Sequence, residues 1–145
     1  MQVQTQASLK GFLVEALASG GHLNGCKLHL ADAMPDPNPS MVPADFTESS
    51  FAGYAAQSLT FNAPYYGLDG LGQVDSNTFT FVPSGVLTTP ATILGWYLTN
   101  TAGTVVYYAE KFANPKILVD TLSAIVGVLQ FGIRQDGLGF NDLNP

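Results

Sequence analysis

The chain has 145 residues and a mass of 15.3 kDa, the size of one domain that can bury a core without disulfides or a metal. Only 11% of the residues are charged, less than half of the usual share of about 25%. The net charge of −6 argues against nucleic-acid binding, which depends on Lys and Arg side chains that neutralise phosphates. Neither a secretory leader nor an apolar run of membrane-spanning length is visible, so we expect no membrane association.

The shortage of charge has two interpretations. Charged residues are depleted from the cores of protein interfaces, so a surface poor in Lys and Glu indicates contact with partner proteins. The alternative is an extracellular β protein rich in Thr and Ser. Composition alone leaves both open.

Residues 1–21 are predicted to form a helical arm. Gly20 and Gly21 end a stretch from Thr5 to Ser19 in which apolar residues recur at helical spacing, namely Leu9, Phe12, Leu13, Ala16 and Leu17. Such a helix either packs on its own domain or is donated to a neighbouring molecule.

A first strand is predicted directly after the glycines. Cys26, Leu28 and Leu30 alternate with Lys27 and His29, the period-two pattern of a half-buried strand. Cys26, the only cysteine, is therefore expected in the core. His29 is expected on the polar, solvated face, and His22 is also expected to be solvated.

Prolines dominate the next segment, from Met34 to Pro43. Proline neither donates to a strand ladder nor fits a helix interior, so this segment is predicted to be a surface loop or an arm that lies on another molecule. As partner contacts we single out Pro35, Pro37 and Pro39. Asp45 and Glu48 then have the spacing of a capping box, which predicts a short helical turn over Phe46 to Phe51.

The remaining pattern predicts strands and turns. Asn100-Thr101-Ala102-Gly103 carries turn chemistry between two β-branched, aromatic runs, which indicates a hairpin. The predicted strands cover residues 57–62, 78–82, 93–99, 104–110 and 125–133. The fold class is mostly β, a single domain with an antiparallel β-sandwich of jelly-roll or Ig-like type over residues 22–134 and a C-terminal tail over residues 135–145.

Residues that carry chemistry are few. Neither histidine lies beside a Ser or Cys nucleophile in the sequence pattern, and the Gly-rich run GLDGLG does not match a dinucleotide-binding motif. Asp69, Asp75 and Asn77 could hold Ca²⁺ in a loop, although their spacing is not that of an EF-hand. We therefore expect a protein that is not an enzyme and that has no cofactor.

Aromatic side chains remain as candidate contacts. Neighbours in a strand face opposite sides, so one of Trp96 and Tyr97 is expected in the core and the other outside. Exposed tyrosines suit a protein interface, and they or Trp96 also suit a sugar-binding platform; ordinary packing within the sandwich is the third interpretation. The candidate partner-binding tyrosines are Tyr54, Tyr65, Tyr66, Tyr97 and Tyr108.

Three segments resemble a known class of proteins: ADFTESSFAGYAAQSL, TFTFVPSG and ILGWYLTNTAGTVVYYAEKF. Together with CKLHL they resemble small virion structural proteins of tailed bacteriophages, over about Cys26 to Ile133. The resemblance implies a capsid decoration (cement) protein or a minor tail protein, made in the bacterial cytoplasm, that binds the major capsid protein on the outer surface of the virion. It also implies a homo-oligomer, with a trimer as one form. A carbohydrate-binding or fibre-associated adhesion module is the alternative.

Overall fold

The computed structural model describes residues 25–62, 65–66 and 72–133. The predicted helix from Thr5 to Ser19 and the predicted tail lie outside these residues. Within them the chain is mostly β, all strand pairs are antiparallel, and one short 3₁₀ helix occurs. The elements are β1 (Cys26–Ala33), η1 (Pro43–Asp45), β2 (Thr47–Glu48), β3 (Gln57–Leu59), β4 (Tyr65–Tyr66), β5 (Gly72–Asp75), β6 (Phe79–Phe81), β7 (Ala91–Thr99), β8 (Val106–Leu118), β9 (Ile125–Gly127) and β10 (Gln130–Ile133).

The largest sheet has the strand order β2-β1-β7-β8, and β3 also pairs with β1. The predicted hairpin joins β7 and β8. Gly103 N donates to Asn100 O over 3.0 Å, and Gly103 has a φ of +73°, which favours glycine. The Asn100 side-chain oxygen accepts from the backbone nitrogens of Thr104 and Val105 over 2.8 and 3.2 Å. Turn chemistry therefore correctly predicted this connection.

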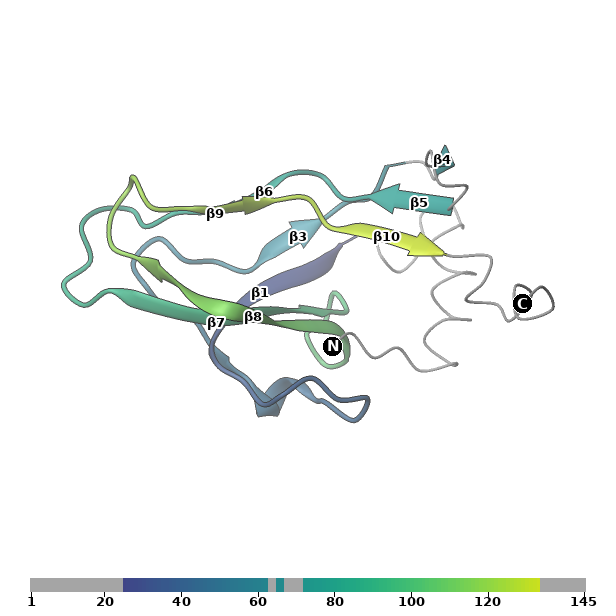
Figure 1. The fold of residues 1–145 in the computed structure, drawn as a ribbon, viewed down its shortest axis with the longest axis horizontal. Coiled ribbons are helices and arrows are strands. Elements are labelled where there is room, and N and C mark those ends of the chain that lie inside the picture. Colours follow the sequence, from purple (N-terminus) through teal and green to yellow (C-terminus); the bar gives the residue numbers. More distant parts are fainter. Residues whose placement is uncertain (1–24, 63–64, 67–71, 134–145) are drawn as a thin grey trace.

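The other strands form a second layer over the large sheet (Figure 1). They make a three-stranded sheet, β10-β5-β4, and a two-stranded sheet, β6-β9. The main core lies between the two layers and contains side chains from both. The inward faces of the strands carry β-branched, aromatic and aliphatic residues, which pack against each other there. Its buried members are Cys26, Leu28, Leu30, Leu59, Phe79, Phe81, Ile93, Trp96, Leu98, Leu118 and Leu129. The predicted core position of Cys26 is confirmed.

Side chains interrupt two of the predicted strands. The stretch from Ile125 to Ile133 splits into β9 and β10 because Leu129 N donates to the Ser76 hydroxyl over 2.9 Å instead of to a strand partner. The stretch from Gln57 to Asn62 is a strand only as far as Leu59, and Thr60 N donates to the Asn77 side chain over 2.9 Å. A polar side chain thus replaces the ladder at each break.

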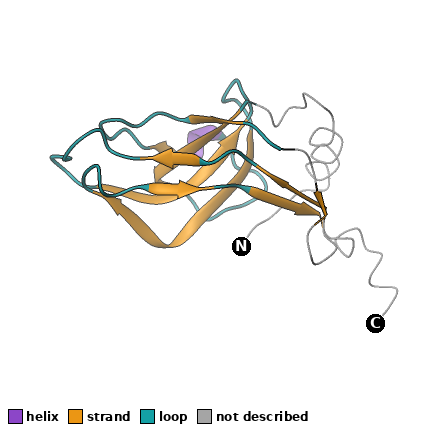
Figure 2. Ribbon diagram, turned by 90° about the horizontal axis from the view of Figure 1, so that it is seen from above, coloured by secondary structure: helices purple, strands orange, loops and turns teal. Residues whose placement is uncertain are grey.

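Residues 34–46 form a strap over the outer face of the large sheet (Figures 1 and 2). Met34 and Phe46, at its two ends, are buried against Ala31 and Tyr97 in a second, smaller apolar cluster. Lys111 Nζ lies 2.8 Å from the Asp36 carboxylate, and this ion pair holds the pKa of Asp36 below its usual value. The proline-rich segment is therefore a loop that lies on its own sheet.

The predicted helical turn over Phe46 to Phe51 is wrong. The turn occurs earlier, at η1, where the Asp45 carboxylate accepts from Val42 N over 2.8 Å. The Asp45 side chain thus caps the start of η1, at Val42. The fixed φ of Pro43 suits the first turn of this 3₁₀ helix. Thr47 and Glu48 instead pair with β1. This pairing places the Glu48 side chain near His29.

Candidate partner-binding surface

Tyr97, one of the predicted contact residues, is buried, with an exposed fraction of 4%. Its ring stacks between His29 and Phe46, with centroid distances of 4.6 and 4.1 Å. Burial raises the pKa of Tyr97 to about 12. Trp96 is buried in the main core, so the prediction that one of these two neighbours lies outside is wrong. The strap covers the outer face, and neither ring is available as a sugar-stacking platform.

His29 is buried and takes part in a polar network, so the prediction of a solvated histidine is wrong. Its Nδ1 is 2.8 Å from a Glu48 carboxylate oxygen, and its Nε2 is 3.0 Å from the Thr99 hydroxyl. The Tyr54 hydroxyl donates to the same Glu48 oxygen over 2.8 Å and accepts from Leu30 N over 3.1 Å. Burial raises the pKa of Tyr54 above its ordinary value. The network joins β1, β2 and β7.

This network contains a histidine and a carboxylate, the groups that general acid–base catalysis uses. However, His29 is 8% exposed and Thr99 is 1% exposed, so the imidazole ring itself is buried, and only the Glu48 carboxylate of this group reaches solvent. Both ring nitrogens of His29 are engaged with protein partners. The arrangement fastens the end of the strap to the sheet, because each buried polar group finds a hydrogen-bond partner there.

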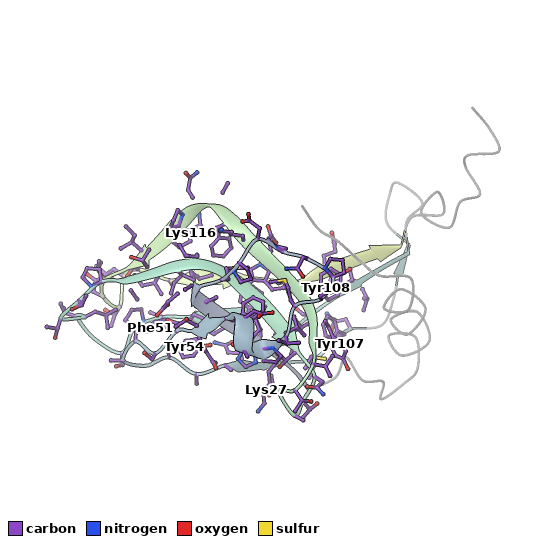
Figure 3. All side chains as sticks on the ribbon, turned by 90° about the horizontal axis from the view of Figure 1, so that it is seen from below. Lys27, Phe51, Tyr54, Tyr107, Tyr108 and Lys116 are labelled. Atoms are coloured by element: carbon purple, nitrogen blue, oxygen red, sulfur yellow. The ribbon has the colours of Figure 1, made fainter. Side chains whose placement is uncertain are left out.

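The structure does not gather the other predicted contacts into one surface. Tyr54 is half-buried beside Phe51, whereas Tyr108 is half-buried elsewhere, with its ring centroid 5.1 Å from that of Phe131 (Figure 3). Burial raises the pKa of Tyr108. Tyr65 and Tyr66 form β4, which pairs with β5. On the strap, Pro37 is half-buried, and the exposed prolines are Pro35 and Pro39.

The predicted Ca²⁺ site is described only in part. Asp75 ends β5, and its carboxylate accepts from the Gln130 side chain over 3.0 Å. Asp69 lies outside the described residues. Among residues 25–62, 65–66 and 72–133, no group of three or more His, Cys, Asp or Glu side chains could hold a metal ion.

A different surface combines exposed apolar side chains with an absence of charge. We call residues 76–92 and 117–129 the neutral end, because Asp120 is their only charged residue. The loops of this end that join β6 to β7 and β8 to β9 lie at the left of Figures 1 and 2. Six of the eight large hydrophobic residues that are exposed in the described chain belong to it: Val86, Ile117, Val119, Leu122, Val126 and Val128. Apolar exposure is therefore concentrated in these two segments, and in other proteins such concentration often accompanies a binding surface.

Analysis of the sequence missed this surface, although one signal was present. No charged residue or histidine occurs from Ser76 to Ala109. The predicted contacts were mainly tyrosines, and those at positions 54, 97 and 108 are half-buried or buried. The exposed apolar side chains of the neutral end are instead Val, Ile and Leu. In a strand pattern these residues are ordinarily read as core.

The comparisons with protein-family models, curated proteins and solved structures find no match. In the part of the chain that the structure describes, no helix is long and apolar enough to cross a membrane.

Proposed function

We propose that this chain is a structural protein of a tailed-bacteriophage virion, a decoration protein that binds major capsid subunits on the outside of the head. The neutral end carries the proposal. Its exposed apolar side chains, with a single charge among them, have the composition of an interface core. A free surface of this kind would favour non-specific association, so a partner that covers it explains its presence.

The proposal includes an architecture and an orientation. The two layers form a β-sandwich of jelly-roll or Ig-like type, a rigid body that presents loops at its ends. The net charge of −6 suits the outer surface of a head, since packaged DNA would repel an acidic protein on the inside. We also propose that several copies of the chain associate on the particle.

The carbohydrate-binding alternative is weaker because the burial of Trp96 and Tyr97 removes its best stacking platforms. A protein of the tail or of a fibre base would also bind through the neutral end, but to a partner other than the major capsid protein. The test therefore has to locate the chain on the particle as well as detect it.

The test starts with particles produced from the genome that encodes this chain. We expect purified heads to contain the chain in a fixed ratio to the major capsid protein, and electron cryomicroscopy to place it on the outer surface. Attachment should survive about 1 M salt, because salt screens charge pairs and leaves apolar contacts intact. Heads without the chain, or chain found only on tails, would contradict the decoration role.

A further inference from the structure

β8 lies at an edge of the large sheet, because β7 is the only strand of the described residues that pairs with it. It is also the longest strand of that part of the chain, with 13 residues from Val106 to Leu118. The backbone N–H and C=O groups on the outer side of an edge strand can pair with a strand of another molecule. A long edge of this kind ordinarily favours association between copies of a protein.

The pairing of β8 with β7 is irregular, however. Ile93 pairs with Lys116 and Gly95 pairs with Lys111, so two steps along β7 correspond to five along β8. The extra residues lie in the stretch 112–115, which therefore bulges out of the ladder. A second register shift lies near the hairpin, and the evenly paired run between the two shifts covers only four residues of β8. A further strand would find only this short run in regular geometry.

The residue types at the bulge also disfavour the addition of a strand. Pro115 has no backbone N–H to donate. Lys111 and Lys116, one on each side of the bulge, are exposed, and charged side chains on an edge resist burial against another strand. Lys111 Nζ lies 2.8 Å from the Asp36 carboxylate, and Lys116 Nζ lies 6.0 Å from the centroid of the Phe112 ring. These contacts keep both ammonium groups beside the strand.

The opposite edge of the large sheet contains only short strands. β2 and β3 pair with the two ends of β1 and have two and three residues. Edge strands this short present few backbone groups to another molecule. β8 is therefore the edge of this sheet that is long enough to extend it, and the bulge, the proline and the two lysines all lie on β8.

We infer that the bulge of β8, together with Lys111, Pro115 and Lys116, prevents two copies of the chain from joining edge to edge into one continuous sheet. Copies that meet on a particle then do so through other surfaces, and the unbound chain stays dispersed. This inference goes beyond the proposed function and does not depend on it, because an open sheet edge would lead to association in any β protein.

Two variants of the full chain remove these features separately. Deletion of residues 113–115 places Phe112 opposite Leu94, so that β8 can follow β7 with an even register. The second variant keeps the length of β8 and introduces threonine, which favours strands; its changes are Lys111→Thr, Pro115→Thr and Lys116→Thr. Loss of two lysines makes the net charge more negative than −6, which by itself opposes association.

Lys27→Thr is the matched control, because it removes a lysine from β1, which has paired strands on both sides. Sedimentation velocity at increasing protein concentration measures self-association, and amide hydrogen exchange locates it. Both variants should associate at least about tenfold more strongly than the wild type, because each cross-strand pair gained in a joined sheet is stabilising. Their amides in residues 106–118 should become protected as the concentration rises. Lys27→Thr should behave as the wild type does.

Three results would overturn the inference. If both variants sediment as the wild type does, the edge needs no protection. If the wild type itself gains protection in residues 106–118 as the concentration rises, β8 is an interface between copies. If Lys27→Thr associates as strongly as the triple threonine variant, loss of lysine is responsible and the edge is not. Should the deletion abolish the cooperative thermal transition, the triple threonine variant alone decides the matter.

Discussion

Replacement of Glu48 by Ala tests whether the network around His29 stabilises the fold. The Glu48 carboxylate accepts from both His29 Nδ1 and the Tyr54 hydroxyl, so its removal leaves two donors without this partner. A buried donor without a partner costs about 1–3 kcal/mol. The Glu48 side chain is 42% exposed, so water partly replaces it. We therefore expect a loss of about 1–3 kcal/mol in the free energy of unfolding, and a smaller loss for Glu48→Gln, whose amide oxygen still accepts.

The assay is urea unfolding followed by the fluorescence of Trp96, the only tryptophan. A double-mutant cycle of His29→Ala and Glu48→Ala should give a coupling energy of about 0.5–2 kcal/mol, because the two side chains are in contact. Glu110→Ala, at an exposed carboxylate on β8, is the control and should lie within about 0.5 kcal/mol of the wild type. A coupling energy of zero, or equal effects of Glu48→Ala and Glu110→Ala, would refute the reasoning.

Three further predictions concern the packing of the large sheet. Trp96→Ala should lower the free energy of unfolding by about 3–5 kcal/mol, because it empties the main core; a near-normal melting temperature would contradict this. Gly95→Ala should lower it by about 1–3 kcal/mol, since a Cβ there would collide with backbone atoms of Glu110 and Lys111 and with Met34; unfolding in urea checks it. Tyr97 holds its proton more tightly in the folded protein, where its pKa is about 12, than at the ordinary value of 10.0. The contribution of this group to the free energy of unfolding should therefore be fully present below pH 10. It should be lost, by up to about 3 kcal/mol, as the pH rises to about 12. Tyr97→Phe should make this fall shallower.

Local pattern correctly predicted the strands of the large sheet that form its centre. The alternation of Cys26, Leu28 and Leu30 placed β1, and the turn at Asn100 to Gly103 placed the β7–β8 hairpin. Both signals depend on residues near each other in the chain. The extension of β8 to Leu118 was missed because Pro115 normally ends a strand. An irregular register between Ile93 and Gly95 of β7 accommodates it, which no local pattern reveals.

The candidate site was harder to predict because its features depend on distant pairing. His29 looked solvated by alternation, yet the strap brings Phe46 and Glu48 onto the same face and turns a polar position into a buried one. Tyr97 is covered in the same way. Exposure of Leu122 likewise follows from the hydrogen bonds of its turn and from the position of the 82–90 loop, which the sequence alone does not place.

The residues that stabilise the fold differ from those of the neutral end that we propose to contact a partner, and that separation makes the proposals testable. The main core, the strap cluster and the His29 network use side chains that are mostly buried, so changes there should unfold the protein before they alter its contacts. Leu122 and Val86 are almost fully exposed and contribute little buried area, so changes there should leave the fold intact. A variant of the neutral end that loses binding therefore reports on the interface itself, and a core variant that loses binding reports only on folding.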